Sequence, residues 1–310
     1  MVTRPDGRMT DRLPPSERRA DVALTTSRFG LLSSQLGVAL YLILPNHWVQ
    51  RCLSSQEKAR IDEGDWYHNT HRPDYADPSQ YQGGVGYDSL TDPRRERSRR
   101  HLVDFLDRVR PASVVEVGPG SGYLTRTIVE HPAVKRYVAV DINGAFLEYL
   151  SSRLDRVSKP GFSYDVVTGV ISDLSEHSFD AAVLIQSVHH IPDRESLFGE
   201  LGTRLRRPGH VLAIDPTHYL LRWQKIVRKV MRRGYLGHHL AEARAGRFST
   251  HAMCQLAEYR AVTRRTGFHI TSVVFADHPS KVRRVAAMGV PLGPFWRWTS
   301  QEIAVECVQD

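Results

Sequence analysis

Cysteine is scarce in this sequence. The 310 residues include three cysteines, and Cys52, Cys254 and Cys307 lie far apart. Disulfide-stabilised secreted domains and zinc sites both need several cysteines at characteristic spacings. The sequence therefore indicates neither class of protein, and we expect a reducing compartment.

A long hydrophobic run is also missing. The most apolar stretch, residues 29–44, is interrupted at residues 33–35 and ends before Pro45. Because about 20 uninterrupted apolar residues are needed to cross a bilayer, we expect a buried or cap helix here, with membrane contact as the alternative. Residues 1–20 are polar and rich in arginine, without the apolar core of a secretion signal. These features predict a cytoplasmic protein.

Charge is unbalanced toward the basic side, with a formal net charge of +8. Such a balance suits nucleic acid, a membrane surface or an anionic small substrate, and it does not choose among them. Six Lys and Arg side chains occupy one side of an expected amphipathic helix over residues 220–233. That helix either faces solvent or recognises an anionic substrate such as a diphosphate.

The length and pattern predict a core domain with appended elements. We expect a flexible tail over 1–28, a helical cap and aromatic lid over 29–92, an α/β core over 93–216, and substrate-side helices with a C-terminal β-hairpin over 217–310. Strands and helices alternate in the core, which is typical of a doubly wound, mostly parallel sheet. The seven expected strands are residues 113–117, 137–141, 164–168, 181–186, 211–214, 269–275 and 301–308. The clearest expected helices after the first strand are residues 124–130, 145–157, 220–233 and 249–266.

Three glycines at alternate positions follow the first expected strand. Gly118 allows a sharp turn, Gly120 lets a ligand approach the main chain, and Gly122 permits close packing of helix against strand. The order acidic-x-Gly-x-Gly-x-Gly differs from the Gly-x-Gly-x-x-Gly of dinucleotide-binding enzymes. The acidic residue of this turn, Glu116, suits a ligand with an ammonium group.

A second acidic residue, Asp141, ends the next expected strand. A carboxylate there can accept hydrogen bonds from both ribose hydroxyls of a bound nucleoside. Together these segments resemble the first motifs of the class I S-adenosylmethionine-dependent methyltransferases. The similarity continues through residues 138–141, 178–183 and 205–212, and it covers residues 96–216 well and the C-terminal part loosely. The resemblance implies a Rossmann-like methyltransferase fold with S-adenosylmethionine as the cofactor.

The resemblance also implies which residues bind the cofactor. The three glycines, with Pro119 among them, would face it, and Glu116 would lie near its amino group and act on it indirectly. Asp141 would hold the ribose and Ile142 would pack against adenine. Gln186, at the end of the fourth expected strand, would present its carbonyl near the methionine amine.

One position departs from the family pattern. Relatives carry an acidic residue after the glycine that follows the third strand, where it reads the adenine amino group. Here that glycine is Gly169, and Val170 follows it. We expect either Asp173 or backbone atoms to take this role, or else a solvent-exposed Asp173 that has no part in it.

Two histidines follow the fourth expected strand, at the sheet edge where such folds bind ligands. An imidazole titrates near neutral pH and can take a proton from a substrate hydroxyl. We expect His189 or His190 to be a general base, with His190 the more structural of the two. Asp215 ends the fifth strand and either orients a histidine or acts as the base. His218 is a further candidate for substrate contact.

An aromatic segment, residues 65–88, has no clean period and suits a lid over a substrate. Its substrate-binding candidates are Trp66, Tyr67, Tyr81 and Tyr87. His68 and His71 are three apart, but no helical or carboxylate pattern surrounds them, so we expect no metal site.

These features predict methyl transfer to a small organic acceptor of secondary metabolism, with an oxygen atom as the first choice. Carbon methylation of an anionic or isoprenoid-like substrate is the second, since the aromatic lid could stabilise cationic charge. The sequence also allows a cyclase-type protein that binds the cofactor without methylating, or a peripheral lipid methyltransferase. Nucleic acid is not expected, because the motifs of base methyltransferases are missing. The oligomeric state stays open, and a dimer is compatible with the sequence.

Overall fold

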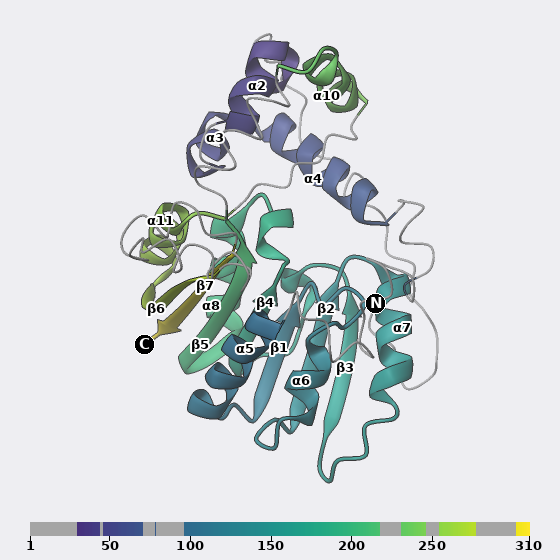
Figure 1. The fold of residues 1–310 in the computed structure, drawn as a ribbon, viewed down its shortest axis with the longest axis vertical. Coiled ribbons are helices and arrows are strands. Elements are labelled where there is room, and N and C mark those ends of the chain that lie inside the picture. Colours follow the sequence, from purple (N-terminus) through teal and green to yellow (C-terminus); the bar gives the residue numbers. More distant parts are fainter. Residues whose placement is uncertain are drawn as a thin grey trace, which may run out of the picture.

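A seven-stranded sheet forms the centre of the protein, in the order β3-β2-β1-β4-β5-β7-β6 (Figure 1). The computed structural model describes residues 30–43, 46–70, 78, 96–217, 231–245, 254–276 and 302–310. The strands are β1 (Ser113–Val117), β2 (Arg136–Asp141), β3 (Ser163–Thr168), β4 (Phe179–Ile185), β5 (Leu205–Pro216), β6 (Phe268–Ala276) and β7 (Glu302–Gln309). Strand β7 lies between β5 and β6 and runs antiparallel to both, whereas the first five strands are parallel. The predicted mostly parallel, seven-stranded fold is confirmed.

Helices cover both faces of the sheet, because each carries an apolar stripe at helical spacing. One face is covered by α5 (Glu96–Val109), α6 (Thr125–Glu130) and α7 (Gly144–Leu154). In α5, for example, Leu102, Phe105 and Leu106 are almost completely buried. The opposite face is covered by α8 (Arg194–Arg204) and α11 (Leu256–Thr266). The sheet is therefore the middle layer of a three-layer core.

A separate cluster of helices lies beyond one end of the sheet (Figure 1). It contains a 3-10 turn, η1 (Leu31–Ser33), and the helices α2 (Gln35–Ile43), α3 (Asn46–Cys52), α4 (Ser55–Thr70) and α10 (Tyr235–Arg244). These elements share their own apolar core, which includes Val38, Tyr41 and Ile61. No helix in the described ranges is both long and apolar enough to pass through a membrane.

Glu57 organises the start of this helical cluster. Its carboxylate accepts hydrogen bonds from the Ser54 amide at 3.0 Å and from the Leu32 amide at 2.7 Å. The Ser54 hydroxyl in turn accepts one from the Glu57 amide at 3.2 Å. This reciprocal capping box begins α4, and the bond to Leu32 fastens η1 to it.

Several boundaries differ from the sequence predictions. Residues 65–70, predicted to lie in an irregular lid, belong to α4, because capping and packing override weak helical propensity. Helix α10 was not predicted, and residues 231–233, predicted in the basic helix, form a turn before it. Residues 254–255 precede α11 rather than lying inside it. The predicted tail over 1–28, most of the lid and most of the basic helix lie outside the described residues.

Candidate active site

Four strand ends meet near the centre of one sheet edge. β1 leads into the glycine loop, residues 118–122, and β2 ends at Asp141. β4 leads into Gln186, and β5 carries Asp215 near its end. Since β1 pairs with β2 on one side and with β4 on the other, the winding of the sheet reverses here. Open α/β sheets bind ligands at such a switch point.

The glycine loop adopts a backbone that side chains disfavour. Gly118, Gly120 and Gly122 have φ angles of +72°, +54° and +76°. A Cβ on Gly118 would lie 2.6 Å from the Cβ of Ser187, so glycine allows this loop to pack against the end of β4. A Cβ on Gly120 would meet nothing within 4 Å. The loop therefore presents open main chain at Gly120, and it is closed by a 3.0 Å bond from the Gly122 amide to the Pro119 carbonyl.

Asp141 joins the end of β2 to this loop. Its Oδ2 accepts a hydrogen bond from the Gly120 amide at 2.9 Å, and its Oδ1 accepts one from the Asn143 amide at 2.9 Å. Burial raises the pKa of this carboxyl. Asp141 and the glycine loop, predicted to bind one ligand, thus lie in direct contact, with the half-buried Ile142 next in the chain.

The turn after β3 carries Val170 at the position where the family pattern has an acidic residue. The Gly169 amide donates to the Asp141 carbonyl at 2.8 Å, so this turn lies beside the end of β2. Asp173 accepts a hydrogen bond from the Val170 amide at 3.1 Å and thereby closes the 3-10 turn η3 (Ile171–Asp173). The Val170 side chain is 47% exposed. The position that relatives fill with a carboxylate therefore offers an apolar surface here.

Glu116 points into the protein rather than toward the loop surface. Its Oε2 accepts hydrogen bonds from the hydroxyls of Thr125 and Tyr137, both at 2.7 Å. The residue is 2% exposed, and burial raises the pKa of its carboxyl to about 7. Glu116 thus ties β1 to the start of α6 and to β2, and contact with a ligand in front of the loop would be indirect.

Gln186 and Ser187 form the opposite wall of the switch point. Gln186 has a φ of +58°, which is uncommon for a residue with a side chain. Its amide donates to the Ile214 carbonyl at 2.7 Å, and its Nε2 lies 3.4 Å from Glu302 Oε2. Ser187 is 5% exposed, yet within the described ranges its hydroxyl has no hydrogen-bond partner. A buried hydroxyl without a partner is costly, and a bound ligand could satisfy it.

The two histidines occupy different surroundings in the 3-10 turn η4 (Val188–His190). His189 is buried, and its Nδ1 lies 2.8 Å from Oδ1 of the fully buried Asp215. The His189 backbone amide also donates to that oxygen, at 3.2 Å. His190 is half-buried, with its ring centroid 4.0 Å from that of His189. Of the two histidines predicted as bases, His189 is the one that the neighbouring carboxylate holds.

Most of the predicted substrate contacts lie outside the described residues. Trp66 lies on α4 and is half-buried, and Tyr67 lies on the same helix. Tyr81, Tyr87 and His218 lie outside the described residues. Within the described part of the chain, no three His, Cys, Asp or Glu side chains gather as a metal site would require.

Two residues near the switch point were missed by the sequence analysis. Ser187 directly follows Gln186, and its place after a strand was the signal that could have found it. Tyr259, on α11, donates to Asp215 Oδ2 at 3.3 Å. Nothing local marks Tyr259, because only the packing of α11 against the sheet brings it to Asp215.

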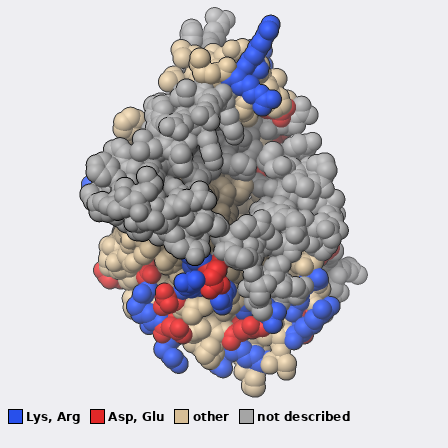
Figure 2. All heavy atoms as spheres, viewed as in Figure 1, with Lys and Arg blue, Asp and Glu red and all other residues tan. Residues whose placement is uncertain are grey.

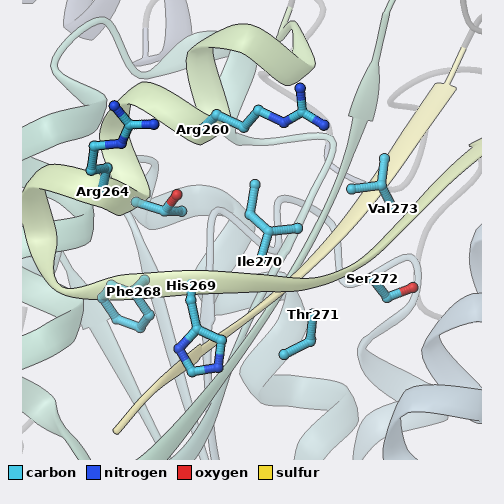
Figure 3. Close-up of a pocket in the computed structure, with 9 residues that line it drawn as sticks. Arg260, Arg264, Phe268, His269, Ile270, Thr271, Ser272 and Val273 are labelled. Atoms are coloured by element: carbon cyan, nitrogen blue, oxygen red, sulfur yellow. The ribbon is translucent and has the colours of Figure 1, made fainter.

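A groove of about 510 Å³ lies elsewhere, between α11 and the edge strand β6 (Figure 3). Arg260 and Arg264 extend above the strand, and Ile270 and Val273 rise from it toward them. None of the predicted site residues lines this groove. It is therefore separate from the switch point.

On one face of the core domain, acidic and basic side chains are mixed rather than segregated. Figure 2 shows Lys and Arg side chains beside Asp and Glu side chains over the lower part of the face in view. Arg136, for example, pairs with both Asp165 and Glu176. On that part of the molecule the excess of basic residues forms no uniform cationic surface.

Comparison with known proteins finds a family that part of the chain matches. Residues 115–214 match the family described as a methyltransferase domain. A stretch of 77 residues is 38% identical to ribosomal RNA small subunit methyltransferase A of Kineococcus radiotolerans. This stretch covers 25% of each protein, so the chain matches about a quarter of the length of that curated relative.

Solved structures share the fold at low sequence identity. Magnesium protoporphyrin IX methyltransferase of Synechocystis superposes with a TM-score of 0.53 at 13% identity, over 79% of this chain and 97% of that one. The cyclopropane synthase of Mycobacterium tuberculosis gives 0.52 at 14% identity, over 80% and 98%. An N-methyltransferase of Bradyrhizobium japonicum, in complex with S-adenosyl-L-homocysteine, gives 0.51 at 11% identity, over 77% and 99%.

Proposed function

The chain carries a class I S-adenosylmethionine-dependent methyltransferase domain, and we propose that the whole protein transfers a methyl group from this cofactor to a hydroxyl oxygen of a small organic acceptor. The observation that carries the proposal is the 2.8 Å contact between His189 Nδ1 and Asp215 at the carboxyl edge of the sheet. The similar proteins act on different acceptors, so the choice of oxygen rests on this pair alone.

The residues at the switch point fit the cofactor. The open main chain at Gly120 suits close approach of a ligand, and the Ser187 hydroxyl, which has no partner among the described residues, suits its polar methionine end. We assign the ribose hydroxyls to Asp141 and the adenine ring to Ile142 and Val170, with the Gln186 carbonyl toward the methionine amine. When bound, the cofactor supplies a methyl group on a positively charged sulfur, which is already a strong electrophile.

The protein contributes alignment and a base. An ionised carboxylate only accepts hydrogen bonds, so Asp215 keeps the proton of neutral His189 on Nδ1. His189 Nε2 is then the basic nitrogen, and it takes the proton of the acceptor's hydroxyl. Asp215 stabilises the imidazolium that results. Such proton transfer typically contributes about 100-fold to 10,000-fold in rate.

The first experiment tests the cofactor site. Asp141→Ala removes the carboxylate assigned to the ribose and its bond to the Gly120 amide, and we expect no measurable binding of S-adenosylmethionine by calorimetry. Asp165→Asn, which changes an exposed carboxylate on the adjacent strand β3, is the control and should bind normally. Unchanged binding by the Asp141 variant would refute the cofactor assignment.

The second experiment tests the acceptor and the base. The full chain is incubated with methyl-labelled S-adenosylmethionine and a panel of phenols, hydroxy acids and prenyl diphosphates. With an accepted hydroxyl compound, His189→Ala should lower kcat by about 100-fold or more and leave cofactor affinity unchanged. His190→Ala should lower it far less. Equal turnover of wild type and both variants would exclude a histidine base, and methylation at carbon would favour the alternative acceptor.

A further inference from the structure

A buried polar network lies behind His189, on the side of α8 and α11. We infer that Tyr259 and the Arg194–Glu258 ion pair are positioning residues, which hold His189 and Asp215 in the orientation and charge state needed for proton removal. The inference rests on the proposed role of His189 as the base. None of these three residues is among the site residues that the sequence indicated.

Tyr259 fixes the carboxylate that orients the histidine. Asp215 uses Oδ1 for His189 and Oδ2 for the Tyr259 hydroxyl, at 2.8 Å and 3.3 Å. Tyr259 is 3% exposed and Asp215 is fully buried, so water does not compete for either oxygen. With a donor on each oxygen, the carboxylate cannot rotate freely, and the Nδ1 contact that sets the histidine's tautomer is preserved.

Arg194 fastens the turn that carries His189. It is the first residue of α8, and its Nε donates to the Val188 carbonyl of η4 at 3.3 Å. Its guanidinium forms an ion pair with Glu258 on α11, and both side chains are 4% exposed. Burial alone would lower the pKa of Arg194, but the nearby carboxylates of Glu258 and Asp215 raise it, so this side chain stays a cation.

The network also sets the charge around the imidazole. Of the groups packed on this side, Asp215 and Glu258 are carboxylates and Arg194 is the cation. Tyr259 and Cys254 stay neutral, because burial raises the pKa of both well above the usual values, and His190 flanks the imidazole from the same turn. Two anions and one cation leave a net charge of −1, which the imidazolium neutralises. The two carboxylates therefore stabilise an imidazolium formed at His189, and the Arg194 cation opposes it.

This arrangement predicts that substitutions of Glu258 and of Arg194 shift the titration of the His189 ring in opposite directions. Glu258→Gln removes an anion, so the His189 imidazolium is less stable and the imidazole titrates at lower pH. Arg194→Gln removes the cation, so it titrates at higher pH, and Arg194→Lys should return it toward the wild-type value. We expect at least about a 3-fold change in proton affinity in each direction, followed by NMR of the His189 ring in the full chain.

Two matched controls separate this effect from helix packing. Arg265 and Glu195 form an exposed ion pair at 2.6 Å between the same two helices, so Glu195→Gln should leave the His189 titration unchanged. Tyr259→Phe should lower kcat by about 3-fold to 10-fold without changing cofactor affinity. Tyr164→Phe, which removes another tyrosine–aspartate contact far from the switch point, should leave kcat unchanged.

The outcomes separate the two proposals. The inference is overturned if Glu258→Gln and Arg194→Gln leave the titration of His189 unchanged, or shift it in the same direction. It is also overturned if Glu195→Gln shifts it equally. Thermal melting confirms that each variant is folded. Failure of the proposed function would instead appear as absent methylation, or as full turnover by His189→Ala, whatever the titration shows.

Discussion

Replacing Glu116 by glutamine should change how the stability of the protein depends on pH. The carboxyl is 2% exposed and accepts hydrogen bonds from Thr125 and Tyr137. Burial raises its pKa from the ordinary 4.5 to about 7 in the folded protein. The folded chain therefore keeps a proton that the unfolded chain releases at lower pH.

The sign and size of the effect follow from this difference. A pKa that is raised in the folded state contributes stability below pH 4.5, and that contribution is lost as the pH rises through about 7. Each pH unit corresponds to about 1.4 kcal/mol. Ionisation of Glu116 should therefore reduce the free energy of unfolding by about 3 kcal/mol between pH 4.5 and pH 8.

Urea unfolding at a series of pH values measures this loss. Glu116→Gln stays neutral and keeps an oxygen to accept both hydrogen bonds, so its stability should not show this decrease. Relative to wild type, the variant should gain about 3 kcal/mol between pH 4.5 and pH 8. Glu130→Gln, which changes an exposed residue paired with Arg126, should follow wild type. Parallel pH profiles for wild type and Glu116→Gln would refute the reasoning.

Two further predictions concern the glycine loop and the wall it packs against. Gly118→Ala places a Cβ 2.6 Å from that of Ser187 at a φ of +72°, so it should destabilise the protein by roughly 2–5 kcal/mol and weaken S-adenosylmethionine binding. Gly161→Ala is the control: Gly161 has a φ of +69° with open space around a new Cβ, so this variant should lose about 1–2 kcal/mol of stability. Equal losses of stability by the two variants in thermal melting would show that the Ser187 contact is unimportant. Ser187→Ala should leave the free protein at least as stable, because it removes a buried hydroxyl that has no partner among the described residues, but it should lower cofactor affinity about 5-fold, because that hydroxyl would bond the ligand. Unchanged affinity in calorimetry would remove Ser187 from the site.

The architecture of the core was predictable because its signals are local. Short apolar runs mark β1 and β2, and a parallel sheet buries such strands on both faces. Position 118 needs glycine because its φ of +72° disfavours any side chain, and Asp141 is the last residue of its own strand. Where a residue's role depends on its own strand or turn, the pattern along the chain contains the information.

The helical cluster was predicted only in part for the opposite reason. Helix α10 contains Gly237, His238 and His239, which weaken its helical pattern, yet it packs against α2 and α4. Its stability comes from apolar contacts with segments almost two hundred residues earlier in the chain. Residues 65–70 are helical for a related reason, because the helix that they end is begun by the capping box at Ser54.

The sequence by itself determined the sheet, the glycine loop and the acidic residues at the strand ends, since each follows from neighbours in the chain. Tertiary structure alone decided that His189 rather than His190 contacts Asp215, and that Tyr259 completes the carboxylate's bonds. Both outcomes depend on the register of β4 against β5 and on how α11 packs beside them. In the sequence, His189 and His190 are two adjacent residues of the same type. They differ only because the η4 turn directs the His189 ring inward, toward the buried Asp215 carboxylate.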